Sequence, residues 1–227
     1  MNRLGIVTGL LSEARCLKDI SGAGLVEVRC AGADARRAEA MARGLAEGGC
    51  AALASFGLAG GLQADLHPGD VILAERLIGG NTPLQPDGAW LAAVRVLLRE
   101  EMRVTVGIVA GTDAAVSTPW DKRCLHERTG AVAVDIESLA VAATAQAFRL
   151  PFLAVRVIAD SARHRVPDWL PGVIDEAGAV CPAAFCGGVL KRPQDLADIF
   201  RLAGANRRAL ASLRRVAALL GPGFGFL

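Results

Sequence analysis

The sequence is poor in the features that mark nucleic-acid-binding proteins. It contains no tyrosine, and aromatic residues make up only 4% of its 227 residues. Single-stranded nucleic acids bind largely by stacking on aromatic side chains, so a binding surface of that kind is not expected. The net charge of +2 is too small for a duplex-binding protein, which neutralises many phosphates with Lys and Arg. No nucleic-acid partner is therefore predicted.

The patterns of metal sites and membrane spans are also missing. The six cysteines form no C-x-x-C pair, and the three histidines (His67, His126 and His164) do not stand at ligand spacing from them. We therefore expect no zinc or iron–sulfur site, and scattered cysteines suit a reducing cytoplasm. No uncharged apolar run of about 18 residues occurs, so no spanning helix is expected. The opening MNRLGIVTGLL predicts a first strand rather than a signal peptide, because no cleavage motif follows it.

Apolar runs alternate with helical patterns along most of the chain, and hydrophobic residues make up 52% of it. Strands are predicted at 4–8, 25–30, 51–56, 70–74, 104–109, 132–134 and 152–158, and helices at 34–48, 90–101, 137–148, 195–202 and 205–220. The third strand is expected to break at GLAGGL (57–62). Near-continuous apolar strands between helices predict one α/β domain over residues 1–227. Its expected architecture is three-layer α/β/α with a twisted, mixed, largely parallel central sheet.

Two segments near the C-terminus differ from this pattern. Residues 161–190 contain three prolines and little periodicity, which predicts a lid or insertion. Within it, Trp169, Leu170 and Phe185 are expected to line an apolar channel. Residues 191–220 form a basic amphipathic helical tail, for which two interpretations stay open. It packs on the domain as an ordinary surface helix, or it lies on anionic lipid as an interfacial helix.

Three acids stand beside apolar segments, where an unpaired charge would be costly to bury. Glu13 follows the first strand, Glu137 opens the helix after AVAVDI, and Asp160 ends FLAVRVIAD. Ligands of α/β sheets bind beyond the carboxyl ends of strands, so the three acids are expected to share one cleft. Each alone is explained equally well as a helix cap or first-turn acid. The glycines of GLAGGL would let a ligand approach the backbone closely.

Four segments together resemble the successive signatures of the purine nucleoside phosphorylase superfamily, in particular its methylthioadenosine/S-adenosylhomocysteine nucleosidases. They are GIVTGLLSEARCL, SFGLAGGLQADLHPGDVILA, AVDIESLAVA and FLAVRVIAD, in order over residues 4–160. The tail VLKRPQDLADIFRLAGANRRALASLRRVA and the opening GIVTGLLSEARC resemble the hopanoid-associated phosphorylases. The resemblance implies cleavage of the N-glycosidic bond of an adenosyl compound, with release of adenine from adenosylhopane in hopanoid biosynthesis.

The resemblance also implies roles for individual residues. Asp160 matches the aspartate that protonates the purine at N7, and Glu13 matches the glutamate that positions and deprotonates the attacking water. Glu137, beside Ile136, matches the glutamate that accepts hydrogen bonds from the ribose hydroxyls. The nucleophile or phosphate loop would comprise Gly57, Leu58, Ala59, Gly60 and Arg156, and the purine pocket would include Ala115 and Val116.

Several positions depart from the family pattern. The serine that usually precedes the aspartate is Ala159, and the serine of the glycine-rich loop is Leu58. Glu13 stands where several phosphorylases carry a phosphate-binding arginine, and a carboxylate there would repel phosphate. These positions favour hydrolysis, although the choice between water and phosphate stays open. Residues 109–119 lack an aromatic residue to stack on the base, so modest base affinity is expected.

No metal or organic cofactor is expected, and phosphate remains an alternative co-substrate. The implied protein is a cytoplasmic homo-oligomer, with peripheral contact to the inner membrane face through its basic tail. Two other functions stay open: a nucleosidase for soluble methylthioadenosine or S-adenosylhomocysteine, and a nucleoside-binding module without catalysis. Removing residues 190–227 is expected to spare activity on soluble nucleosides.

Overall fold

The computed structural model describes residues 3–21, 24–80 and 82–226. Within these residues seven strands form one sheet: β1 (Arg3–Thr8), β2 (Val26–Cys30), β3 (Cys50–Gly61), β4 (Val71–Ile78), β5 (Val104–Gly111), β6 (Ala133–Asp135) and β7 (Phe152–Asp160). Their order is β2-β1-β3-β6-β5-β4-β7, and β3 also pairs with β7. The β3–β6 and β4–β7 pairs are antiparallel and the other pairs are parallel. The predicted mixed, largely parallel sheet is confirmed.

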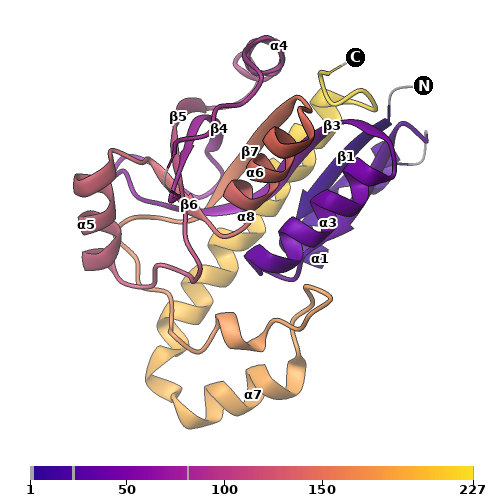
Figure 1. Ribbon diagram of the computed structural model, residues 1–227. Coiled ribbons are helices and arrows are strands. Elements are labelled where there is room, and N and C mark those ends of the chain that lie inside the picture. The colour runs from indigo at the N-terminus through magenta and orange to yellow at the C-terminus, as the bar shows by residue number, and fades with distance from the viewer. Residues whose placement is uncertain (1–2, 22–23, 81, 227) are drawn as a thin grey trace.

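Helices cover both faces of the sheet (Figure 1). They are α1 (Leu11–Ala14), α2 (Lys18–Ser21), α3 (Ala35–Glu47), α4 (Gly88–Leu98), α5 (Pro119–Thr129), α6 (Ser138–Phe148), α7 (Pro182–Lys191) and α8 (Leu196–Leu220). The described residues also contain three 3₁₀ turns: η1 (Arg15–Leu17) between α1 and α2, η2 (Pro171–Val173) between β7 and α7, and η3 (Pro193–Asp195) between α7 and α8. The sequence predicted no helix at α1, α2, α5 or α7, because short or polar helices carry a weak periodic signal.

Side-chain alternation along β7 divides the core into two layers. Val155 and Val157 point to the face covered by α4 and α8, where Leu213 packs against the sheet. Ala154 and Ile158 point to the opposite face, which α3 and α6 cover. Successive side chains of a strand alternate between faces, so a strand buried on both sides needs the continuous apolar run seen in the sequence. The three-layer prediction is confirmed.

Strand β3 does not break at GLAGGL, as the sequence analysis expected. It runs from Cys50 to Gly61, and its Gly57–Gly60 stretch pairs with Arg156–Asp160 of β7, with a register shift between Ala59 and Gly60. Glycine weakens a strand but does not end it when a neighbour supplies the ladder hydrogen bonds. The glycines instead leave room on one face, where an added Cβ at Gly57 would lie 2.6 Å from Oε2 of Glu13.

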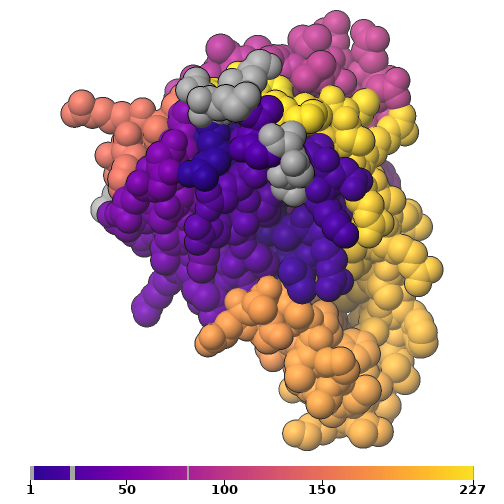
Figure 2. Space-filling view, turned by 90° about the vertical axis from the view of Figure 1, so that its right-hand side faces the viewer, coloured from indigo at the N-terminus to yellow at the C-terminus, as the bar shows by residue number. Residues whose placement is uncertain are grey.

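The two helices predicted at 195–202 and 205–220 are one continuous helix, α8, of 25 residues. Its first turns, together with η2, α7 and η3, project from the end of the molecule (Figures 1 and 2). We refer to residues 166–203 as the outer lobe. From Ala205 onward α8 is part of the core, with these buried side chains: Ala205, Ala209, Leu213, Val216, Ala217 and Leu220. Their burial argues against the prediction that removing residues 190–227 spares activity on soluble nucleosides.

Candidate active site

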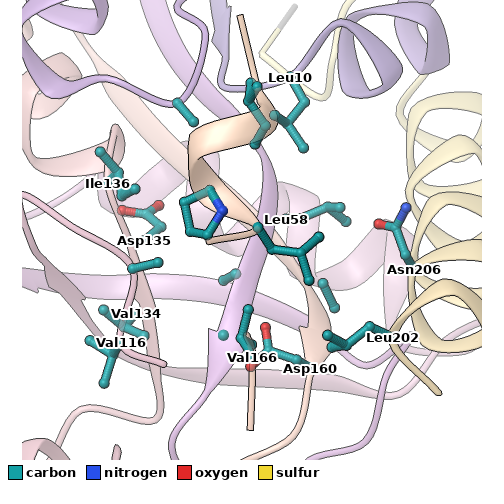
Figure 3. A pocket seen from close by; sticks show the side chains of 18 of the residues that line it. Leu10, Leu58, Val116, Val134, Asp135, Ile136, Asp160, Val166, Leu202 and Asn206 are labelled. Carbon is teal, nitrogen blue, oxygen red and sulfur yellow. The ribbon is translucent and has the colours of Figure 1, made fainter. Parts of the chain in front are cut away.

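The three acids line one cavity of about 400 Å³. Figure 3 shows this cavity, with Asp135 and Asp160 among its lining side chains. Glu13 comes from α1, Glu137 precedes the first residue of α6, and Asp160 is the last residue of β7. The outer lobe and the following turn of α8 close the opposite side with Val166, Leu170, Pro171, Ile174, Phe185, Ile199, Leu202, Ala203 and Asn206. The cavity is therefore polar where the strands end and largely apolar where the lobe covers it.

Most of the residues predicted for the site line this cavity: Glu13, Leu58, Ala59, Gly60, Ala115, Val116, Ile136, Glu137 and Asp160. Gly57 and Arg156 lie behind that wall, since they are paired across β3 and β7 and the Arg156 side chain is fully buried. The roles assigned to them in a nucleophile or phosphate loop stay predictions. Of the expected channel residues, Leu170 and Phe185 line the cavity, and Trp169 packs on Phe185.

Glu13 is held by the backbone of two separate elements. Its Oε2 accepts hydrogen bonds from the N–H groups of Gly9 (2.8 Å) and Leu10 (2.9 Å), and its Oε1 accepts one from Leu58 (2.8 Å). Burial raises the pKa of Glu13, while the Arg156 guanidinium and these N–H groups oppose the rise. Glu13 is thus both a first-turn acid and a cavity residue, so the two interpretations of the sequence are compatible.

Arg156 is the buried cation around which the carboxylates gather. Its Nε donates to the Asp135 carboxylate, and its Nη2 donates to Ser55 Oγ at 2.6 Å. Nη2 also lies 3.5 Å from the Glu137 carboxylate, whereas Nη1 has no hydrogen-bond partner among the described residues. Asp135 additionally accepts from the hydroxyl of Ser138. Asp135 is therefore the counter-ion of Arg156, which explains an acid within the apolar AVDIESLAVA.

Glu137 is a second buried acid of this cluster with a raised pKa. Burial raises its pKa to about 8, the Arg156 guanidinium opposes the rise, and the charges of Asp135 and Glu13 add to it. With a pKa of about 8, Glu137 is mostly protonated at neutral pH. Gly9 packs directly against its carboxyl group, where a Cβ would collide with Oε1. Only glycine fits at that position without moving Glu137.

Asp160 has a partner that the sequence did not indicate. The ammonium of Lys122, on α5, donates to Oδ2 of Asp160. Burial raises the pKa of Asp160, and Lys122 opposes the rise. The sequence analysis missed Lys122 because it lies in the polar stretch PWDKRC, where a lysine is ordinarily solvated. No local signal marks it, since its burial depends on the position of α5.

A family model described as the phosphorylase superfamily matches residues 28–171. The chain belongs to the phosphorylase superfamily. A 5'-methylthioadenosine/S-adenosylhomocysteine nucleosidase of Listeria monocytogenes is 29% identical over 131 residues, which are 48% of this chain and 56% of that protein. The chain thus spans about half the length of the curated relatives it matches.

Solved structures extend the likeness in fold to nearly the whole chain. The 5'-methylthioadenosine/S-adenosylhomocysteine nucleosidase from Helicobacter pylori superposes with a TM-score of 0.70 at 17% identity, over 96% of this chain and 98% of that one. Futalosine hydrolase of Helicobacter pylori superposes equally well, with a TM-score of 0.70 at 17% identity over 96% and 97%. At such identity these likenesses establish the fold.

In this member of the superfamily, the part of the cavity predicted to hold the purine is lined by small, non-aromatic side chains. Ala115, Val116 and Thr112 line it, and Phe185 of α7 is an aromatic residue on the lobe side. Among the described residues, no group of His, Cys, Asp and Glu side chains is arranged to hold a metal ion. No helix in the same part of the chain is long and apolar enough to cross a membrane.

Proposed function

We propose that this protein hydrolyses the N-glycosidic bond of an adenosyl compound and releases adenine. The observation that carries the proposal is that Glu13, Glu137 and Asp160, from three distant segments, line one cavity. The membership of the phosphorylase superfamily and the likeness to nucleosidases support it. Two further proposals concern the nucleophile and the remainder of the substrate.

The reaction needs an acid at the base and a negative charge at the sugar. As the C1′–N9 bond breaks, its electron pair moves to the base, and Asp160 transfers its proton to N7, so that adenine leaves neutral. The sugar gains positive charge, which Glu137 stabilises through the ribose hydroxyls in its ionised form; with a pKa of about 8, that form is the minor one at neutral pH. The oxygen of water bonds to C1′, and Glu13 accepts the proton that the water loses. General acid catalysis of this kind contributes roughly 10²- to 10⁴-fold.

Charge in the cavity favours water over phosphate as the nucleophile. The residues that line the cavity include four acids (Glu13, Asp135, Glu137 and Asp160), and no lysine or arginine of the described residues is among them. Arg156 lies behind the wall and already pairs with Asp135. A phosphate dianion would therefore leave water without an accessible cation to pair with, whereas a neutral water molecule carries no such cost.

The apolar wall favours a lipid as the remainder of the substrate, and we propose adenosylhopane. The group on the ribose 5′ carbon would lie against Leu170, Ile174 and Phe185 of the outer lobe. The homocysteine of S-adenosylhomocysteine carries an ammonium and a carboxylate, which need charged partners when they leave water. On the lobe side of the cavity, Asn206 is the one polar lining side chain in the described part of the chain.

The decisive experiment incubates the purified protein with adenosylhopane, methylthioadenosine or S-adenosylhomocysteine, each with and without phosphate, and identifies the products by mass. Free adenine and a ribosyl lipid without phosphate are expected. A strict phosphate requirement would refute hydrolysis, and faster release from the soluble nucleosides would favour the nucleosidase alternative. No release from any substrate, together with nucleoside binding, would favour a non-catalytic module.

The Asp160→Asn protein should lose about 10²- to 10⁴-fold in kcat, since the amide cannot protonate the base. Asp65→Asn is the matched control, because its side chain is exposed and lies outside the cavity residues. Full turnover by Asp160→Asn would contradict the assignment of the acid.

A lipid substrate requires access to a bilayer, and we propose that the outer lobe provides it. Leu190 and Phe200 are 82% and 75% exposed, which is unusual for large apolar side chains, and Lys191, Arg192 and Arg201 lie beside them in the chain. Exposed apolar side chains among cations suit a peripheral contact with anionic lipid. The same lobe forms the apolar wall of the cavity.

Co-sedimentation with phosphatidylglycerol vesicles tests this contact. The Leu190→Ser/Phe200→Ser protein should bind roughly tenfold or more weakly, because two apolar groups no longer enter the interface. Val96→Ser, an exposed apolar position on α4, should bind as the unmodified protein does. Equal loss in both variants, or equal binding to neutral phosphatidylcholine vesicles, would contradict the proposal.

A further inference from the structure

Lys122 is a fully buried lysine on a helix whose neighbouring side chains face water. It is 0% exposed, whereas Asp121 and Arg123 on either side of it are exposed. Removing an ammonium group from water is costly, so lysines are almost never fully buried without partners. The position therefore needs a reason beyond the packing of α5.

All three N–H groups of the Lys122 ammonium have acceptors. Nζ donates to Oδ2 of Asp160, and to the backbone carbonyls of Ser161 and His164 at 3.0 Å each. An ammonium has three donors and no acceptor, so the cage matches its hydrogen-bonding capacity. Among the described residues Oδ1 of Asp160 has no such donor, and Asp160 lines the cavity. One carboxyl oxygen is fixed by α5 while the other is free for a ligand.

This arrangement stabilises the Asp160 carboxylate that a proton transfer to the base leaves behind. When Asp160 gives its proton to the base, a carboxylate remains beside a cation that is already in place and needs no reorganisation. In this step the proton passes from Asp160 to the ring nitrogen, and Lys122 transfers no proton of its own. We propose that Lys122 is a positioning residue for Asp160, which orients the carboxyl group and stabilises the charge it acquires. This inference rests on the proposed adenine release.

The same hydrogen bonds connect Asp160 to the segment that leads into the outer lobe. Ser161 and His164 begin the segment that leads from β7 into the outer lobe, and Ser161 Oγ lies 2.9 Å from His164 Nδ1. The charged and titratable groups that act on the Asp160 carboxyl are Lys122 from α5 and His164 from this turn. The Lys122 side chain thus holds both Asp160 and the start of the segment that leads into the outer lobe.

Replacing Lys122 by Met separates the electrostatic role from a structural one. Without the ammonium the pKa of Asp160 rises, so the basic limb of the kcat–pH profile should move about one to three pH units upward. At neutral pH kcat should fall about 10- to 100-fold, while KM changes less than about threefold, because a weaker acid donates its proton less readily. Arg123→Met, which removes one charge from an exposed position of the same helix, should change neither.

A double substitution gives the sharper test. In an Asp160→Asn background, Lys122→Met should cause little further loss of kcat, because Lys122 acts through Asp160. Equal losses in both backgrounds, or an unmoved pH limb, would overturn the proposal. If Lys122→Met does not fold, Lys122→Gln removes the charge and keeps two donors for the carbonyls, with the same expected limb shift.

A readout without turnover distinguishes failure of this inference from failure of the proposed function. The Asp160 carboxyl carbon, followed by ¹³C NMR during a pH titration, should titrate at higher pH in Lys122→Met or Lys122→Gln than in the unmodified protein. Unchanged titration would refute the electrostatic role. Absence of adenine release by the unmodified protein would refute the function, and the titration would still report on the ion pair.

Discussion

At the scale of single residues, burial decides which acids of the cavity carry protons. Asp135 has Arg156 Nε and the Ser138 hydroxyl as donors, so its charge is compensated. Burial raises the pKa of Glu137 to about 8; Arg156 Nη2 at 3.5 Å opposes the rise, and the charges of Asp135 and Glu13 add to it. Two acids that are two positions apart in the sequence thus have different partners: Asp135 has two side-chain donors, whereas Glu137 has only the more distant arginine nitrogen.

The raised pKa of Glu137 makes stability depend on pH. Between 4.5 and about 8 the unfolded chain has lost this proton and the folded protein keeps it. Unfolding then releases a proton, so stability falls as pH rises through this window, at up to about 1.4 kcal/mol per pH unit. Glu137→Gln should lose stability less steeply in urea titrations from pH 5 to 8. Glu127→Gln, on the exposed face of α5, is the control and should show the same dependence of stability on pH as the unmodified protein. If Glu137→Gln also showed that dependence, the Glu137 carboxyl would be ionised throughout this range and the prediction would be wrong.

At the scale of elements, the glycine-rich half of β3 is a strand that leaves space for carboxylates. A Cβ at Gly57 would lie 2.6 Å from Glu13 Oε2 and 2.9 Å from Arg156 Nη1, both closer than van der Waals contact. The sequence indicated that GLAGGL allows close approach, but the groups that approach Gly57 are side chains of the protein itself. Only the pairing of β3 with β7 and the position of α1 bring them there.

Gly57→Ala should therefore displace Glu13 and destabilise the fold by about 1–3 kcal/mol. Adenine release should fall by more than the decrease in the folded fraction explains. Gly44→Ala is the matched control in α3, where an added Cβ meets nothing within 4 Å. That variant should be more stable by about 0.5–1 kcal/mol, because alanine favours the helix. Chemical denaturation and adenine release measure both effects. A Gly57→Ala protein as stable and active as the control would show that Glu13 can move freely.

At the scale of the whole molecule, α8 joins the core to the outer lobe. Its first turns carry the exposed Phe200 and line the cavity with Ile199 and Leu202, while Leu213 is fully buried against the sheet. Beyond the helix, Phe224 is buried and its carbonyl accepts a hydrogen bond from Trp90 Nε1 at 2.9 Å. The helix therefore cannot be removed without opening the core.

Substitutions at two leucines, one in the outer lobe and one in the core part of α8, test this description. Leu213→Ala should lower the free energy of unfolding by about 2–5 kcal/mol, because it leaves a cavity in the core. Leu190→Ala, at a position that is 82% exposed, should change it by less than about 0.5 kcal/mol. Removal of residues 190–227 should abolish the cooperative thermal transition. A truncated protein that melts cooperatively would contradict this description of α8.

The sequence by itself determined the layered α/β fold. A strand that is buried on both faces needs apolar residues at successive positions, and this pattern can be recognised without knowing which elements lie next to the strand. It also indicated Glu13, Glu137 and Asp160, because acids next to apolar runs are conspicuous along the chain. Tertiary structure alone decided that Asp135 pairs with Arg156, that Lys122 is buried against Asp160, and that α8 belongs to the core. Each of these depends on which groups meet across 20 or more positions of sequence, and burial and charge pairing act through space.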